Sequence, residues 1–189
     1  VVAPPITPTV WSALATAGLA FAGGLIQAAL IAVWPQRRWR VQRDALAKAY
    51  RSLSADARRI AEGTGDGVSA VDPEPLISLR AAFTAADVQA KRHTADYRSW
   101  YGLPERIAAT LAELDGVAAD ARPREVLYAV ADTLAAVAET RRSARADAEA
   151  AISRLDAAVD SESPVVHRLT RLVHEAVAIR LGGFLPSSP

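Results

Sequence analysis

Two histidines near the C-terminus form the closest approach to a metal-binding pattern in this chain. His167 and His174 lie seven residues apart, so on a helix they share one face, and Glu175 follows the second. Two helical turns separate their backbones by about 10 Å, which is too far for both imidazoles to bind one ion directly. Histidines on the outer side of an amphipathic helix are the simpler interpretation, and we predict no metal site and no cofactor.

Other patterns that could support chemistry are incomplete. The glycine-rich run at residues 63–67, GTGDG, lacks the GK[ST] ending and the preceding strand of a phosphate-binding loop. No nucleophile elbow, dinucleotide-binding glycine pattern or metalloprotease motif occurs, and the absence of cysteine excludes thiolate catalysis. Tyr97, Trp100 and Tyr101 could line a site for an aromatic ligand or pack beneath a loop. We therefore predict no catalytic residue and no enzyme.

The elements that must position these residues are helices, because apolar residues recur at three- and four-residue spacing. After a helix over residues 39–62, prolines open further helices at Pro73, Pro104, Pro123 and Pro164. The charged run at residues 139–149 is either an exposed part of one helix over residues 123–160 or a bend between two. The expected core residues are Leu46, Tyr50, Leu53, Ala57, Ile60, Leu76, Leu79, Phe83, Ala86, Ala90, Ile107, Leu111, Leu114, Val126, Val130, Leu134, Val137, Ala148, Ile152, Leu155, Val159, Val166, Leu169, Leu172, Val173, Ala176 and Val177.

Residues 10–34 are the most distinctive stretch, because none is charged and Gln27 is their only strongly polar side chain. As a helix, this stretch would reach about 37 Å, enough to cross a hydrocarbon core of about 30 Å. A core helix of a soluble protein would show a polar face at 3.6-residue spacing, and none is present. We therefore predict a transmembrane helix at residues 10–36, preceded by an extracytoplasmic loop at residues 1–9.

Arginines and tryptophans mark the ends of this predicted span. The basic residues follow it, whereas no charge precedes it, so the positive-inside rule places its C-terminal side in the cytoplasm. Indole rings prefer the lipid headgroup layer. Lipid is thus a predicted partner, and the net charge of +1 gives no reason to expect nucleic acid. The predicted membrane-interface residues are Trp11, Trp34, Arg37, Arg38, Trp39, Arg40 and Arg43.

Small residues recur at every fourth position along the predicted span. They are Thr16, Ala20, Gly24, Ala28 and Ala32. Such a seam lets another helix approach closely, although an alanine-rich composition could also produce it by chance. We predict a packing face for further transmembrane helices of the same chain, in a homo-oligomer. Gln27 is a candidate contact for a transport pathway or for an interhelical hydrogen bond.

The remainder of the chain fits one domain. Residues 37–183 are expected to form a single cytoplasmic helical domain, and residues 184–189 a linker to a following segment. The predicted fold is therefore all-α, with one transmembrane helix followed by a cytoplasmic antiparallel helical bundle. Because the chain starts at Val1 and contains no methionine, we expect it to belong to a longer protein.

The apolar stretch followed by WPQRRWRVQRDALAKAYRSLSADARRIAE and later by YGLPERIAATLAEL resembles the fusaric acid resistance and aromatic acid exporter family of bacterial inner-membrane proteins. In that family a block of transmembrane helices precedes a helical cytoplasmic domain, and the pair is commonly repeated. The resemblance implies that residues 34–43 leave the last helix of a block, residues 45–60 descend into the cytoplasm and residues 102–114 form a later helix. A single span departs from the family pattern.

The resemblance also implies a function, which is export of small aromatic acids or related toxic organic compounds. In such an exporter this chain would supply the last span of a block and its cytoplasmic domain. The alternative is a single-pass membrane-anchored helical scaffold that binds a protein partner. Further apolar spans on both sides of the native chain would distinguish the exporter from the scaffold.

Overall fold

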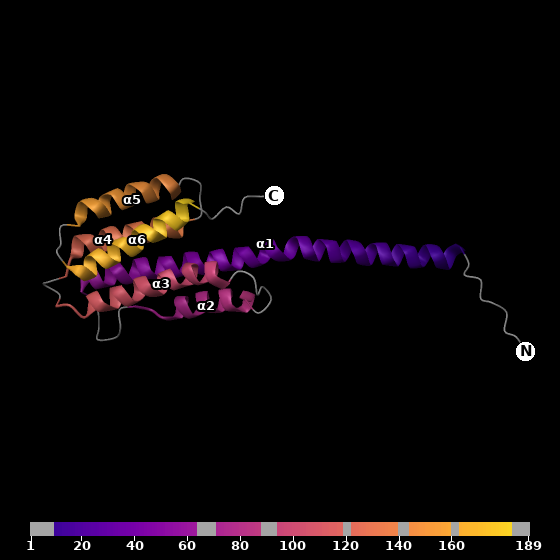
Figure 1. Ribbon diagram of the computed structural model, residues 1–189, viewed down its shortest axis with the longest axis horizontal. Helices are drawn as coiled ribbons and strands as arrows, with labels where there is room; N and C mark the ends of the chain where they lie inside the picture. Colours follow the sequence, from indigo (N-terminus) through magenta and orange to yellow (C-terminus); the bar gives the residue numbers. More distant parts are fainter. Residues whose placement is uncertain are drawn as a thin grey trace, which may run out of the picture. The chain divides into compact units, whose positions relative to one another are not determined.

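The computed structural model describes residues 10–63, 71–87, 94–118, 122–139, 144–159 and 163–182, and within some helices it leaves out side chains, namely those of residues 10–12, 29–39, 85–87, 94–101, 144 and 180–182. Every regular element of the described residues is an α-helix, so the prediction of an all-α fold is confirmed. The helices, labelled in Figure 1, are α1 (Val10–Glu62), α2 (Glu74–Asp87), α3 (Thr94–Asp115), α4 (Arg124–Ala138), α5 (Ala144–Ala158) and α6 (Pro164–Gly182).

The chain divides into two units, Val1–Val41 and Gln42–Pro189, and α1 contributes residues to both. We describe each unit by itself. The first unit has described side chains at residues 13–28, 40 and 41, and all of them are exposed. Among the residues that the structure describes, no helix is long and apolar enough to cross a membrane.

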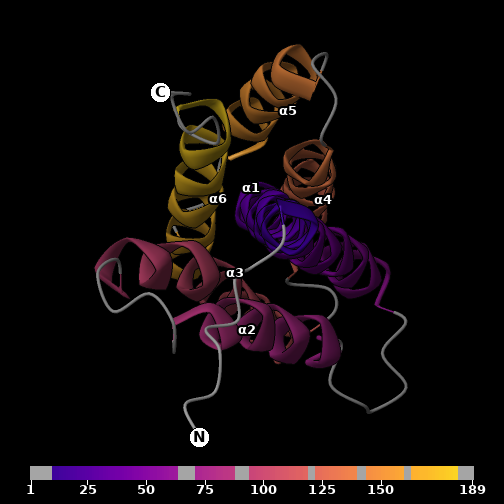
Figure 2. The ribbon, with the colours of Figure 1, turned by 90° about the vertical axis from the view of Figure 1, so that its right-hand side faces the viewer.

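In the second unit, residues 42–62 of α1 lie in the middle of a bundle, bordered by α3, α4 and α6 (Figure 2). Helix α2 packs against α3, and α5 packs against α4 and α6. The core residues expected on the inner faces are buried, apart from Leu76, Ile152 and Val159, which are partly buried against the core. Ala86 and Ala90 lie outside the described side chains. Apolar periodicity thus identified the inner face of each helix.

Several helix ends carry local sequence signals. The backbone N–H of Glu74 donates to the Asp72 carboxylate at 3.0 Å, which makes Asp72 the cap of α2. Gly63 follows α1 with a φ of 71°, a conformation that glycine adopts without a Cβ clash, and its N–H donates to the Arg59 carbonyl at 3.0 Å. Pro164 is the first residue of α6, as predicted, and Gly182 is the last.

The predicted start of the third helix was wrong. The sequence predicts that Pro104 opens a helix, but α3 already begins at Thr94 and contains Pro104 in its interior. A proline there removes one intrahelical donor. Leu103 and Pro104 are both buried, so tertiary packing of this turn offsets the lost hydrogen bond.

The segment at residues 123–160 forms two helices rather than one. Helix α4 ends at Ala138, where Glu139 takes an extended conformation with φ −71° and ψ 139°. The backbone N–H of Glu139 donates to the Ala136 carbonyl, and this hydrogen bond closes the last turn of α4. Helix α5 begins at Ala144, and residues 140–143 lie outside the described residues. Of the two alternatives left open by the sequence, the bend between two helices is therefore correct.

Candidate functional site

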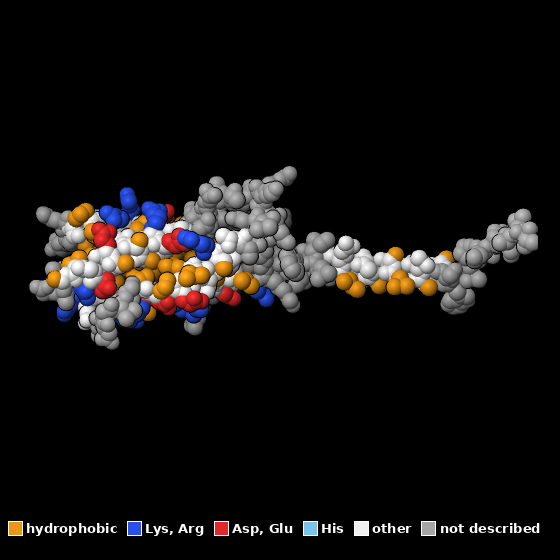
Figure 3. Space-filling view, turned by 90° about the horizontal axis from the view of Figure 1, so that it is seen from below, with side chains coloured by type: hydrophobic (Ala, Val, Ile, Leu, Met, Phe, Trp, Pro, Cys, Tyr) orange, Lys and Arg blue, Asp and Glu red, His pale blue; other side chains and the backbone are white. Residues whose placement is uncertain are grey.

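The first unit offers an apolar helical surface that no other described part of the unit covers. The large side chains of this helix include Leu19, which is 76% exposed, and Phe21, which is 70% exposed. Figure 3 shows such hydrophobic side chains gathered along this helix. Burying one side chain of this size is worth about 1.5–3 kcal/mol. A surface of this kind favours coverage by lipid or by another helix.

The predicted packing seam belongs to this exposed surface. Thr16, Ala20, Gly24 and Ala28 are all exposed, whereas the side chain of Ala32 lies outside the described residues. With 3.6 residues per turn, the exposed Gln27 falls at an angle between Thr16 and Ala20, so it shares the seam face. One face of the helix therefore combines small side chains with the only strongly polar one.

Of the predicted membrane-interface residues, the structure describes two side chains. Arg40 and Arg43 are exposed, and neither forms an ion pair with another described residue. Both guanidinium groups are thus accessible to an anionic headgroup. The other predicted interface side chains lie outside the described residues; these are Trp11, Trp34, Arg37, Arg38 and Trp39.

The histidines are not brought together at one site. His167 and His174 are both exposed on α6, and the imidazole Nε2 of His174 lies 2.7 Å from the Asp156 carboxylate of α5. Glu175 instead faces Arg106 of α3 at 3.5 Å. Within the described part of the chain, no group of three histidine, cysteine or acidic residues could hold a metal ion.

The aromatic cluster and the glycine-rich run lie mostly outside the residues that the structure describes. The side chains of Tyr97, Trp100 and Tyr101 are not described, although all three residues belong to α3. Residues 64–67 of the glycine-rich run also lie outside the described residues. A site for an aromatic ligand at Tyr97, Trp100 and Tyr101 therefore stays a prediction.

Sequence reasoning missed the buried carboxylate of Asp56. Asp56 is fully buried in α1, where it accepts hydrogen bonds from the Arg59 guanidinium and from the backbone N–H of Asp72 at 3.3 Å. Burial raises the pKa of the Asp56 carboxyl, and the two donors offset only part of this rise. The position was detectable in principle, because residue 56 lies three residues after Leu53 and four before Ile60, on the edge of the inner face.

Asp56→Asn is expected to stabilise the bundle by about 1 kcal/mol at pH 7, since replacing a buried charge removes its desolvation cost. The asparagine oxygen can still accept from the N–H of Asp72. Because the folded-state pKa of Asp56 is raised, the folded protein binds the proton more tightly than the unfolded chain, and wild-type stability falls as pH rises through that raised pKa. The gain from Asp56→Asn should therefore grow from acidic to neutral pH.

Thermal unfolding of both proteins, followed by circular dichroism in mild detergent between pH 4 and pH 8, measures this effect. Asp44→Asn is the control, since Asp44 is an exposed residue of the same helix. A difference between wild type and Asp56→Asn that does not change with pH would contradict the assignment of a titrating buried carboxylate.

Arg122 was also missed by sequence reasoning, and it joins three parts of the bundle. Its guanidinium donates to the carbonyls of Asp115 at 2.6 Å, Val117 at 2.9 Å and Ile60 at 3.2 Å. Its side chain also lies 3.5 Å from the Asp115 carboxylate and is only 13% exposed. A cation at the C-terminal ends of α1 and α3 satisfies carbonyls that have no partner within their helices. No local pattern marks such a residue, because the Ile60 carbonyl is 62 positions away.

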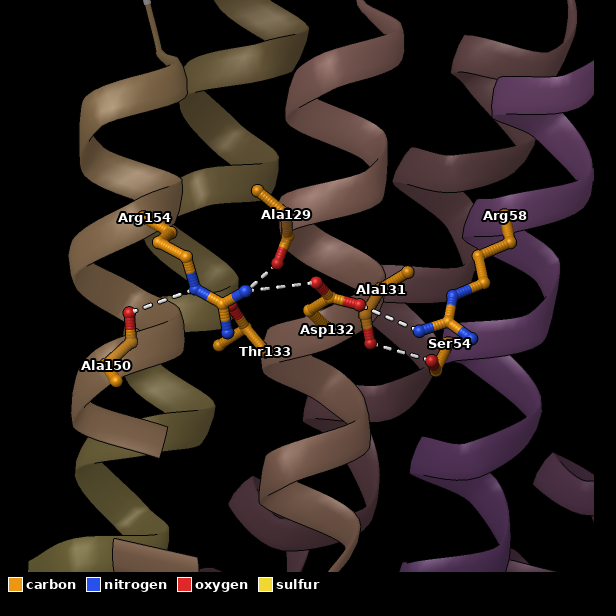
Figure 4. Close-up of polar contacts among 8 residues, drawn as sticks. All are labelled: Ser54, Arg58, Ala129, Ala131, Asp132, Thr133, Ala150 and Arg154. Carbon is orange, nitrogen blue, oxygen red and sulfur yellow. Dashed lines mark hydrogen bonds and ion pairs between the residues drawn. The ribbon is translucent and has the colours of Figure 1, made fainter. Parts of the chain in front are cut away.

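A second polar network joins α1, α4 and α5, as Figure 4 shows. Asp132 of α4 pairs with Arg58 of α1 at 2.7 Å and with Arg154 of α5 at 3.5 Å. Beside it, the buried Ser54 hydroxyl donates to the Ala131 carbonyl at 2.7 Å. These contacts position helices, and they involve no nucleophile with an adjacent general base.

Tyr50 is a further polar side chain of the core and is 5% exposed. Burial and, to a smaller extent, the negative charge of Glu175 raise the pKa of Tyr50, so the phenol stays neutral at physiological pH. Its surroundings resemble a packing position rather than a reactive one. The candidate site of the described residues is therefore the exposed apolar helix of the first unit.

Comparisons with known proteins identify no family for this chain. The chain matches no protein-family model, no curated protein and no solved structure.

Proposed function

We propose that this chain is part of an integral inner-membrane exporter of small aromatic acids or related toxic organic compounds. Residues 10–36 form the last transmembrane helix of a block in this proposal, and residues 37–183 form its cytoplasmic domain. The partners are lipid, further transmembrane helices of the same protein and other copies of the chain. The helices of the cytoplasmic bundle run antiparallel to their neighbours along the chain.

The observation that carries the membrane part of the proposal is the exposure of an uncharged, apolar stretch of α1. All described side chains at residues 13–28 are exposed, and the same uncharged sequence continues on both sides to residues 10 and 34. Exposure of this apolar surface to water is unfavourable in free energy, whereas exposure to the hydrocarbon of a bilayer carries no such cost. The exposed Arg40 and Arg43 suit the cytoplasmic headgroup layer.

The bundle supports the proposal through its surface and connections. Its described charged side chains are mostly exposed and form pairs such as Arg168–Glu113 at 2.9 Å, as expected for a domain in water. The connection from Ala138 to Ala144 is short, which favours antiparallel neighbours. The assignment of an export function rests on the family resemblance of the sequence.

Retention of aromatic acids in cells tests the export function. The native gene is expressed in a strain that lacks its efflux systems, and retention of a panel of aromatic acids is compared with an empty-vector control. An exporter lowers retention, and an uncoupler abolishes the difference if export is proton-driven. Equal retention across the panel, with the protein inserted in the membrane, would contradict export and favour the anchored scaffold.

Gly24→Leu is expected to weaken helix association in the membrane at least severalfold, because it fills the seam with a large side chain. A Cβ at Gly24 meets no atom within 4 Å, so the substitution causes no clash among described residues of the chain itself. Any loss of association therefore reports on a partner helix.

Gly18→Leu is the matched control, since Gly18 is equally open but lies about 120° from Gly24 around the helix. Cross-linking in native membranes, or a reporter of transmembrane association, measures both variants. Equal association of the Gly24→Leu and Gly18→Leu proteins would remove the seam from the proposal.

A further inference from the structure

Helix α5 contributes little apolar side-chain area to the core of the bundle. Its fully buried side chains are Leu155 and the two small residues Ala148 and Ala151, and Ile152 is partly buried. Its neighbour α4 buries larger side chains along its whole length, namely Val126, Leu127, Val130, Leu134 and Val137. Since the hydrophobic contribution follows buried apolar area, α5 is held by a smaller free energy than α4.

The packing of α5 explains how it lies close to its neighbours without burying much area. It lies on the outer side of the bundle, against α4 and α6 (Figure 2). Alanine side chains on its inner face allow a close approach of the helices, but each alanine removes only one methyl group from water. Leu155 is therefore the main apolar anchor of α5.

The polar contacts of α5 with its neighbours add little to the free energy that holds it in the bundle. Arg154 lies 3.5 Å from Asp132, with side chains 65% and 40% exposed, and Asp156 lies 2.7 Å from His174, with side chains 54% and 44% exposed. Exposed ion pairs of this kind contribute little to stability, because water screens their charges. Neither pair can replace the apolar area that α5 lacks.

The polar groups of α4 near α5 keep their partners when α5 is removed. Asp132 retains its 2.7 Å contact with Arg58 of α1, and the Thr133 hydroxyl donates to the Ala129 carbonyl of α4 itself (Figure 4). Several polar side chains of α5 have their partners within α5 itself. Arg145 pairs with Glu149 four residues later, and the Ser153 hydroxyl donates to the Glu149 carbonyl. Detachment thus leaves few buried polar groups without a partner, so it carries little of the usual cost.

We infer that α5 is a detachable helix, which leaves α4 and α6 reversibly while the remaining helices stay folded. Local opening of this kind occurs in regions with few buried apolar contacts. Detachment uncovers the side of α4 at Ala129 and Thr133, next to Arg154 in Figure 4. This inference does not depend on the proposed export function.

Hydrogen exchange of the full chain, in detergent or lipid nanodiscs and followed by mass spectrometry, tests the inference. Peptides from α5 should be at least tenfold less protected than peptides from α4 and α6. Leu155→Ala should accelerate exchange in α5 by about 30-fold or more, as expected for a buried leucine, and leave α1 to α4 unchanged.

Ser153→Ala is the matched control, because Ser153 is an exposed residue of α5, and it should change exchange less than about threefold. Protection of α5 equal to that of α4 and α6 in the wild type would overturn the inference. Acceleration of all helices together by Leu155→Ala would also overturn it, since α5 would then unfold only with the whole bundle.

Discussion

Arg122→Gln is expected to lower the free energy of unfolding of the bundle by about 3 kcal/mol, the largest effect that we predict for an exchange of one polar side chain. The guanidinium is nearly buried and donates to three backbone carbonyls, from the ends of two helices and the segment after the second. A hydrogen bond to a charged group contributes about 1.5–3 kcal/mol. Loss of the guanidinium removes this donor from the Asp115 and Val117 carbonyls, whereas the Ile60 carbonyl still accepts from the backbone N–H of Gly63 at 3.3 Å. Glutamine is shorter and carries only one amide nitrogen, so it cannot serve all three carbonyls.

The unfolding midpoint in thermal or chemical denaturation of the full chain in mild detergent measures this loss. Arg122→Lys should lose nearly as much stability as Arg122→Gln, since an ammonium group cannot reproduce the planar geometry of the guanidinium. Arg124→Gln is the matched control, because Arg124 is the same residue type two positions later and is exposed. Equal midpoints for the Arg122→Gln and Arg124→Gln proteins would show that the Arg122 contacts do not stabilise the fold.

The double substitution Leu19→Arg and Leu25→Arg is expected to prevent stable membrane insertion. Both leucines are exposed and lie in the central part of the proposed span. Each arginine near the centre of a span costs about 2.5–3.5 kcal/mol on insertion scales, and the favourable contribution of each leucine is lost as well. The two changes together therefore disfavour insertion by about 5 kcal/mol or more.

The fraction of protein that stays in membranes after washing with alkaline carbonate measures insertion. Leu19→Ala with Leu25→Ala is the control, since it removes the same two side chains without adding charge, and it should stay mostly membrane-bound. If the double-arginine protein resists extraction as strongly as the double-alanine protein, residues 10–36 do not span the bilayer.

Local sequence signals were sufficient for the secondary structure of most of the second unit. The cap at Asp72 and the end of α1 at Gly63 depend on the conformations of one or two neighbouring residues, so they could be predicted without knowledge of the fold. The same signals failed at Pro104. The residue type favours a helix start, but burial of Leu103 and Pro104 against the bundle stabilises a helix that runs through the proline.

For the candidate site, too, some features could be predicted from the sequence and others could not. The absence of charge at residues 10–34 and the fourfold spacing of small residues are properties of the sequence, and the exposure of residues 13–28 agrees with them. In contrast, the sequence grouped His174 with His167 and Glu175, whereas the structure places His174 beside Asp156 of another helix. Spacing along one helix cannot reveal which side chains a neighbouring helix brings near.

The sequence by itself determined the all-helical class, most helix ends and the inner face of each helix, because these follow from backbone preferences and a periodicity of a few residues. Only the tertiary structure decided that Asp56 is a buried carboxylate and that Arg122 joins the ends of α1 and α3. Their partners lie up to 62 positions away along the chain. The packing of the helices creates those contacts, and the desolvation that gives them their energy exists only once the bundle has formed.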